Sequence, residues 1–279
     1  MPIHDQSYRR YRGGKMMPGQ AWTVIARAGI LNLLRKRVFL GVLLGGWIPF
    51  VGYAIWLYVN ANYPQVSIVA VTPKLFRDFF GWQDFFVFVI TVYVGAGLIA
   101  NDRRANALQI YLSKPLARSE YILGKAAVLI AFLLSITLVP AMLLLLLQVL
   151  FSGSFEFIRK NLFLIPAIGT ASLLQALLAA FTMLALSSLS KSARFVAIMY
   201  AGIIFFTLAI FGVLSAITAS TRLSWVALGA NLQQVTDVIF RQTPRYQTPW
   251  QVSLIVTLAL IALSISVLER RVRGVEVVT

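Results

Sequence analysis

Six apolar stretches, each free of Asp, Glu, Lys, Arg and His, occupy about half of the 279-residue sequence. A bilayer core about 30 Å thick needs roughly 17 to 25 mostly apolar residues per spanning helix, and these stretches have that length. They predict an all-α integral membrane protein with six transmembrane helices, at about residues 38–59, 85–101, 126–151, 162–189, 195–216 and 250–268.

The composition excludes a soluble globular protein. Hydrophobic residues make up 59% of the chain and charged residues only 12%, about half the usual charged share. We expect residues 1–37 to form a basic tail and an interfacial helix, residues 38–268 the transmembrane domain, and residues 269–279 a second tail. The chain has no Cys, and its one His, His4, lies in the polar tail. No thiolate or histidine metal site is therefore expected.

The distribution of basic residues predicts the orientation. Six spans place both termini on one side, where the tails and loops carry 18 of the 25 Lys and Arg residues, against 7 on the other side. Cytoplasmic loops are enriched in Lys and Arg. We therefore expect a multi-pass protein of a bacterial cytoplasmic (inner) membrane with both termini in the cytoplasm. The net charge of +16 is attributed to contact with anionic lipid headgroups, and no nucleic-acid partner is expected.

Known catalytic patterns are missing from the sequence. It has no HExxH or GxSxG motif, so we expect no enzyme, and it has no GxxxxGK[ST] loop to hold a nucleotide phosphate. The six stretches also lack the ionisable groups that bind protons or sodium in ion-coupled carriers. Energy for any uphill transport must therefore come from a separate polypeptide.

An amphipathic pattern precedes the first predicted span. Its apolar positions recur at i, i+3 and i+4 spacing, at Trp22, Ile25, Ala26, Gly29, Ile30, Leu33 and Leu34. This spacing predicts a helix lying on the inner membrane surface. Its role is either anchoring or contact with a partner.

The loop between the second and third spans, residues 102–125, is also patterned. It carries a short apolar helical face formed by Leu108, Tyr111 and Leu112. Pro115 is expected to end this short helix, and Ser119 is placed to cap the next one. An exposed apolar face on a cytoplasmic loop usually marks an interface.

This loop resembles the first long cytoplasmic loop of the membrane subunits of type-2 ATP-binding-cassette (ABC) transporters. The matching positions are Asp102, Leu108, Leu112, Pro115, Arg118, Gly124 and Lys125, while Asn106 and Ala107 stand where that family usually has Gly-Thr. The six-span plan and the amphipathic N-terminal helix extend the resemblance over most of the chain.

The resemblance implies a permease subunit that works as a dimer, most simply a homodimer, with two copies of a separate ABC ATPase. The loop would be a coupling helix that docks into the ATPase through Arg103, Arg104, Leu108, Tyr111, Leu112 and Pro115. The transport path would be lined by Thr91, Tyr93 and Thr207. This chain would hold no cofactor, because ATP and Mg would bind in the ATPase. The resemblance leaves room for a periplasmic partner protein and does not identify the substrate.

Two further segments, Lys74 to Phe86 and Leu223 to Phe240, mix apolar residues with too many polar ones to span the membrane. Both are predicted to lie at the outer interface. Two other interpretations of the chain stay open. A scaffold or assembly factor would need the same topology without a transport path, and a facilitative channel would be expected to show rings of polar pore-lining residues.

Overall fold

The computed structural model describes residues 20–63, 71–107 and 117–272. These residues form helices and connecting loops, and six helical segments are long and apolar enough to cross a membrane, which confirms the predicted all-α six-span fold. The spans cover Arg37–Asn62, Lys74–Arg104, Arg118–Ser152, Leu164–Leu189, Ala193–Thr218 and Trp250–Arg271.

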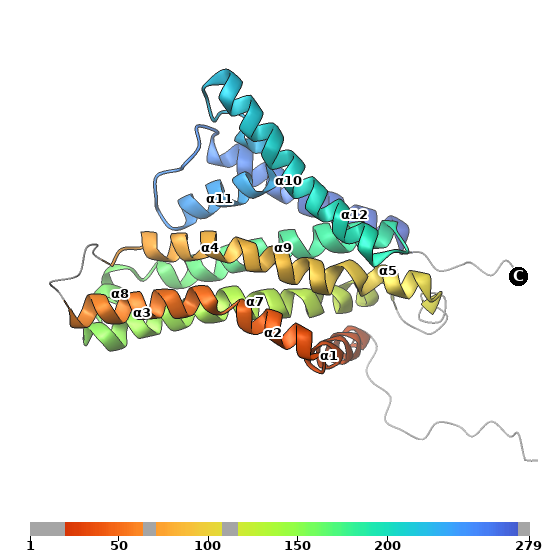
Figure 1. The fold of residues 1–279 in the computed structure, drawn as a ribbon, viewed down its shortest axis with the longest axis horizontal. Helices are drawn as coiled ribbons and strands as arrows, with labels where there is room; N and C mark the ends of the chain where they lie inside the picture. The colour runs from red at the N-terminus through yellow and green to blue at the C-terminus, as the bar shows by residue number, and fades with distance from the viewer. Residues whose placement is uncertain (1–19, 64–70, 108–116, 273–279) are drawn as a thin grey trace, which may run out of the picture.

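The helices form a bundle whose two ends differ (Figure 1). α3 (Ile48–Asn62), α4 (Lys74–Ile90), α7 (Arg118–Ser152) and α9 (Leu164–Leu189) run side by side, with α7 and α9 the most buried. α10 (Ala193–Thr218) leans away from them, and α12 (Trp250–Arg271) packs on α9.

α1 (Ala21–Leu34) and the last turn of α12 lie at one end of the bundle, here called the terminal end. α8 (Glu156–Lys160) lies at the opposite end, here called the far end. Both the first and the last described helices therefore reach the same end, as an even number of spans requires.

The first span is broken in its middle. α2 (Arg37–Gly45) is followed by Gly46 and Trp47, and α3 begins at Ile48. A Cβ atom on Gly46 would lie 2.9 Å from the Ile136 side chain of α7. A glycine is therefore needed here, because the broken helix approaches α7 too closely for a side chain.

Pro140 lies inside α7, where it cannot donate a backbone hydrogen bond to the carbonyl of Ile136. The buried side chain of Gln83, on α4, donates to this carbonyl through Nε2. The same Nε2 donates to the Gly46 carbonyl at 2.9 Å. The Gln83 amide thus joins the second span to the break in the first span and to the third span near Pro140. The carbonyl that Pro140 leaves without its α-helical donor is therefore satisfied by a neighbouring helix.

The second span is longer than its apolar stretch, because α4 already begins at Lys74. The segment from Lys74 to Phe86, predicted to be interfacial, is continuous with the span. A π-helical segment, Thr91–Gly95, joins α4 to α5 (Ala96–Arg104). Such segments leave backbone groups without their regular α-helical partners.

Ser187 of α9 binds the backbone just beyond this π-helical segment. Its hydroxyl accepts hydrogen bonds from the backbone N–H groups of Ile99 and Ala100, at 3.2 and 3.0 Å, and donates to the carbonyl of Ala96 at 2.9 Å. The close approach of the two spans also depends on Gly95, where a Cβ atom would lie 2.4 Å from Met183. The irregular segment is therefore held by packing and hydrogen bonds from α9.

α1 packs directly along the start of α7 and is more than a surface anchor. A Cβ atom on Gly124 would lie 2.8 Å from Ile25, and one on Gly29 would lie 2.6 Å from Val128. The predicted apolar face is the one that packs, with Ala26 and Leu33 buried against the bundle. The helix is tied to the transmembrane core by two glycine contacts.

Candidate transport path and coupling region

The terminal end holds the described part of the predicted coupling region. Leu108, Tyr111, Leu112 and Pro115 lie outside the described residues. Arg103 and Arg104 form the last turn of α5, and Arg104 is exposed. The Arg103 guanidinium donates through Nη1 to the backbone carbonyl of Ser188 in α9. The structure therefore shows how the loop leaves the second span.

Asn106 has a positive φ of 53° directly after α5. This left-handed conformation favours glycine, and asparagine is among the few other residues that adopt it readily. The family usually has glycine at this position. The departure noted in the sequence therefore preserves the local backbone geometry.

Both flanks of the loop are joined to one another. The carboxylate of Asp102, at the end of the second span, lies 2.7 Å from Nζ of Lys125 and accepts a 2.7 Å hydrogen bond from the Tyr121 hydroxyl. Lys125 also lies over the Tyr121 ring, 5.5 Å from its centroid. The start of the third span is thereby fixed to the end of the second.

Glu120 performs the capping that the sequence assigned to Ser119. Its Oε2 accepts from the backbone N–H of Ala117 at 3.0 Å, at the start of α7, and its Oε1 accepts from Ala21 at 3.2 Å, at the start of α1. A longer acidic side chain reaches two helix starts, and a negative charge is favoured near helix N-termini. The prediction that Ser119 caps this helix was therefore wrong.

The three residues predicted to line the path face different surroundings. Thr91 is fully buried in the π-helical segment, near Tyr200 of α10. Tyr93 is 39% exposed and stacks on Phe39 of α2, with ring centroids 5.7 Å apart. Thr207 donates its hydroxyl to the Ile203 carbonyl of its own helix at 2.8 Å. None of the three lines either of the two cavities described below.

Charged residues that the sequence did not single out gather at the far end. Asp237 of α11 (Leu228–Ile239) is completely buried and contacts two arginines. Its Oδ1 lies 2.8 Å from Nη2 of Arg245 and 3.2 Å from Nη1 of Arg77 on α4. Arg245 also donates to Asp237 through its backbone N–H. The pair of arginines thus compensates the buried carboxylate.

Arg245 lies in the loop between α11 and α12, outside the spans. Burial by itself lowers the pKa of its guanidinium, but the hydrogen bond to Asp237 and the charge of Asp237 together raise that pKa above its ordinary value. The contact with Asp237 therefore favours the charged form of this guanidinium.

Asp84 lies one residue before the second apolar stretch, inside the spanning helix α4. Its carboxylate accepts a 2.7 Å hydrogen bond from Gln175 of α9 and a 3.1 Å hydrogen bond from Gln233 of α11. The second span therefore carries an ionisable group, because the helix extends past the boundary of its apolar stretch.

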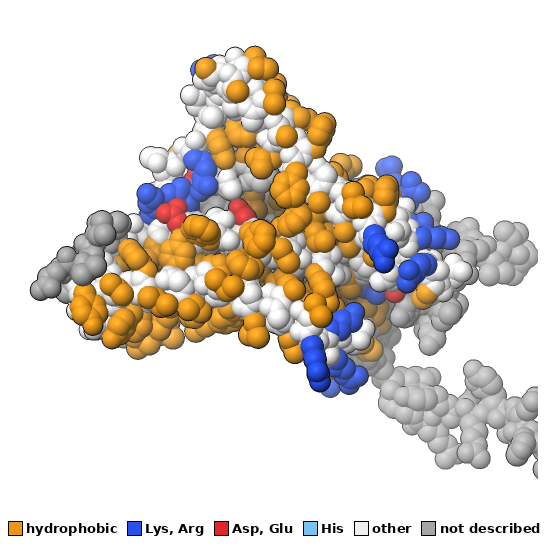
Figure 2. Space-filling model, viewed as in Figure 1, with side chains coloured by type: hydrophobic (Ala, Val, Ile, Leu, Met, Phe, Trp, Pro, Cys, Tyr) orange, Lys and Arg blue, Asp and Glu red, His pale blue; other side chains and the backbone are white. Residues whose placement is uncertain are grey.

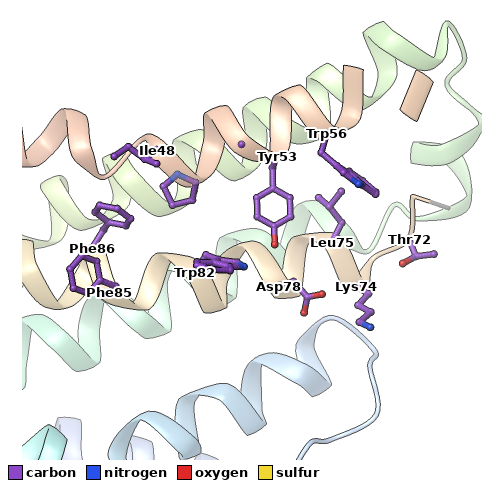
Figure 3. Close-up of a pocket in the computed structure, with 12 residues that line it drawn as sticks. Ile48, Tyr53, Trp56, Thr72, Lys74, Leu75, Asp78, Trp82, Phe85 and Phe86 are labelled. Atoms are coloured by element: carbon purple, nitrogen blue, oxygen red, sulfur yellow. The ribbon is translucent and has the colours of Figure 1, made fainter. Parts of the chain in front are cut away.

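Two adjoining cavities lie beside α4 at the far end. The larger, about 770 Å³, runs between α3 and α4 and is mostly apolar (Figure 3). The smaller, about 470 Å³, is mostly polar and includes Gln233 and Arg245 in its lining. Tyr53, Asp78 and Trp82 line both.

The space-filling view shows this distribution on one face (Figure 2). Hydrophobic side chains cover the surface along the spans, basic side chains gather at the terminal end, and a mixed acidic and basic patch lies beside α11 at the far end. Sequence reasoning missed this patch because its charged residues come from α4 and from α11 with the loop after it, which are far apart in the sequence.

Comparison with known proteins agrees with this architecture. The sequence model of the ABC-2 family transporter protein family matches residues 49–272, which is most of the chain and includes five complete spans. No curated protein matches the chain. The chain therefore belongs to the ABC-2 transporter family, as a multi-pass membrane permease component of an ABC transporter.

Proposed function

We propose that this protein is the permease subunit of an ATP-driven transporter, working as a homodimer with two copies of a separate ATPase that binds ATP and Mg. The terminal end would face the cytoplasm, and residues 108–116 would dock into the ATPase. Family membership and the excess of basic residues on the terminal side support this proposal.

The observation that carries the coupling proposal is the way both flanks of the loop are anchored. Asp102 joins α5 to Lys125 and Tyr121 of α7, and Arg103 joins α5 to α9. Glu120 joins α7 to α1. A displacement of the loop would therefore reach the second, third and fourth spans and α1 together, which is what a coupling element needs.

A second copy would be placed against the exposed face of α10. This face carries large apolar side chains, among them Phe205, Phe206, Leu208 and Val213. Lipid or a second copy can cover such a surface. We place the second copy here because α10 leans away from the bundle (Figure 1) and these side chains are exposed in the described chain. Thr91, Tyr93 and Thr207 remain our candidates for the path, and bulky substitutions there should reduce transport.

The coupling proposal is tested by the double substitution Tyr111→Ala and Leu112→Ala. Truncating a buried aromatic at the centre of an interface commonly costs at least about 2 kcal/mol of binding. The double variant should insert and express normally but lose the ATPase on co-purification, or hydrolyse ATP without transport. Phe155→Ala, at an exposed site in the loop before α8, is the matched control. A double variant that keeps its partner and full transport would show that the loop is not the coupling element.

Orientation is tested by single-cysteine labelling, since the chain has no native Cys. A membrane-impermeant reagent applied to intact cells should label a Cys at Ser154 and leave a Cys at Gln109 unlabelled. The reverse pattern would invert the topology. A protein that shows the expected topology but never binds an ATPase would instead be a scaffold or a channel.

A further inference from the structure

The two joined cavities beside α4 differ in chemistry along their length. The larger is lined by Ile48, Pro49, Trp56, Leu75, Phe85 and Phe86, among others. The smaller is lined by Asp78, Gln233 and Arg245 together with Tyr53, Gly81 and Trp82. Because the cavities share Tyr53, Asp78 and Trp82, an occupant can extend from an apolar groove into a charged mouth.

The dimensions of the groove correspond to part of one lipid leaflet. Its lining on α4 runs from Lys74 to Phe86, which at 1.5 Å per residue is about 18 Å, and the part from Asp78 to Phe86 accounts for about 12 Å of this. Half of a bilayer core is about 15 Å thick. The charged mouth lies toward the far end of α4, where the span reaches headgroup level, and Trp82 is 69% exposed near this mouth. Tryptophan is enriched at that level of the membrane.

The charges at the mouth have both signs. Lys74 and Asp78 lie one turn apart on α4, and both line the groove (Figure 3). Arg245 lines the polar cavity with Asp78, and its side chain remains 30% exposed although it pairs with Asp237. The Asp78 carboxylate pairs with Nε of Arg77 at 2.7 Å, and the Asp78 side chain remains 40% exposed, so it can still accept a second cationic group. An anionic group can approach Lys74 and Arg245 while a cationic group approaches Asp78.

We propose that these cavities form a binding site for a zwitterionic phospholipid, with an acyl chain in the groove between α3 and α4 and a phosphoethanolamine-type headgroup at Lys74, Asp78 and Arg245. A ligand site typically combines a mostly apolar lining with a few placed polar groups, and this one does so at the depth where a lipid changes from chain to headgroup. The site belongs to this chain alone and does not require the ATPase.

Gly52 and Gly169 allow a matched test. Gly52 lines the groove, and a Cβ atom there would meet nothing within 4 Å, so a large side chain can fill the groove without displacing the backbone. Gly169 of α9 has the same free space and lines neither cavity. Gly52→Trp should therefore block the site, and Gly169→Trp should leave it open.

The experiment uses the full chain in nanodiscs containing a phosphatidylethanolamine with a photoactivatable acyl chain, and peptide mass spectrometry locates the labels. Labelling of the peptides that carry Ile48–Trp56 and Leu75–Phe86 should saturate and be competed by unlabelled phosphatidylethanolamine. Gly52→Trp should lower it roughly fivefold, the effect of about 1 kcal/mol of lost binding. Gly169→Trp should not change it.

Headgroup recognition is tested by Asp78→Asn and by a phosphatidylglycerol probe with the same acyl chain. Asp78→Asn should lower labelling by the phosphatidylethanolamine probe severalfold and leave labelling by the phosphatidylglycerol probe unchanged, because only the first carries an ammonium group. Unsaturable labelling spread over all lipid-facing helices would overturn the proposal. A Gly52→Trp variant that labels normally would also overturn the proposal. If that variant in addition loses its dimer, the groove is an interface between copies. Co-purification of the ATPase, measured separately, decides the permease proposal independently.

Discussion

The two ends of one continuous helical segment, Lys74–Arg104, are held by different kinds of contact. At the far end, Arg77 contacts Asp237, which is completely buried and also pairs with Arg245. At the terminal end, Asp102 pairs with Lys125, and both side chains keep some contact with solvent, at 19% and 14% exposure. The same helix is therefore held at one end by a fully buried carboxylate whose arginine partners are 14% and 30% exposed, and at the other end by a pair in which neither side chain is fully buried.

This difference has an energetic consequence. Breaking a buried ion pair leaves an uncompensated charge in a medium that solvates it poorly, whereas a partly exposed pair can exchange its partner for water. The far end is thus expected to be a fixed point. The terminal end, next to the proposed coupling segment, can rearrange at low cost. The π-helical segment between the two ends gives the helix a place to bend.

The largest effect is expected from Asp237→Ala at the far end. It removes the carboxylate that pairs with both Arg77 and Arg245, and only Arg77 keeps another acidic partner, Asp78, so the free energy of unfolding should fall by roughly 3–5 kcal/mol. Thermal unfolding of the purified protein in detergent measures this as a marked decrease in Tm. If Asp237→Ala lowered the Tm no more than Asp102→Asn does, the two ends of the helix would not differ in their contribution to stability.

A smaller effect is expected midway along the segment, from Gln83→Leu. This substitution leaves the carbonyls of Ile136 and Gly46 without their donor, which should cost roughly 1–3 kcal/mol. Pro140→Ala restores a backbone N–H that can satisfy Ile136 within α7. In the Pro140→Ala background, Gln83→Leu should therefore cost less. Equal costs in both backgrounds would mean that Gln83 does not compensate for the proline.

At the terminal end, Asp102→Asn should cost only about 1 kcal/mol, because the pair with Lys125 is partly solvated and Asn still accepts from Tyr121. Its effect on coupling should be larger than its effect on stability. With the ATPase present, substrate-stimulated ATP hydrolysis should decline while Tm remains nearly constant. A large loss of stability with normal coupling would show that the terminal end is as rigidly held as the far end.

The smallest effect is expected from Glu156→Gln in α8. The hydrogen bond and charge of Lys160 lower the pKa of Glu156, so any stabilisation is present above the ordinary pKa of glutamate and is lost as the pH falls through the lowered value. Both side chains are strongly exposed, at 67% and 71%. No change in Tm at neutral pH is therefore expected, and a measurable decrease would show that solvent screening is weaker at this surface than the comparison assumes.

Local composition was sufficient to predict the number of spans, their approximate limits and the end of the bundle where basic residues gather. Each of these depends on local composition, since a bilayer requires about 20 apolar residues per helix wherever that helix packs. The apolar face of α1 followed from residue spacing in the same way. Asn106 appeared in the sequence as a departure from the family pattern, and its left-handed conformation accounts for it.

Only the tertiary structure decided which polar groups meet. Asp84, Gln175 and Gln233 are distant in the sequence, and α4, α9 and α11 bring them together. Gln83 seemed an ordinary residue beside an apolar stretch until α7 and the break after α2 placed two carbonyls next to it. The physical reason is the same in both cases. A polar group within the membrane needs a partner, and that partner is supplied by helix packing, which local composition does not encode.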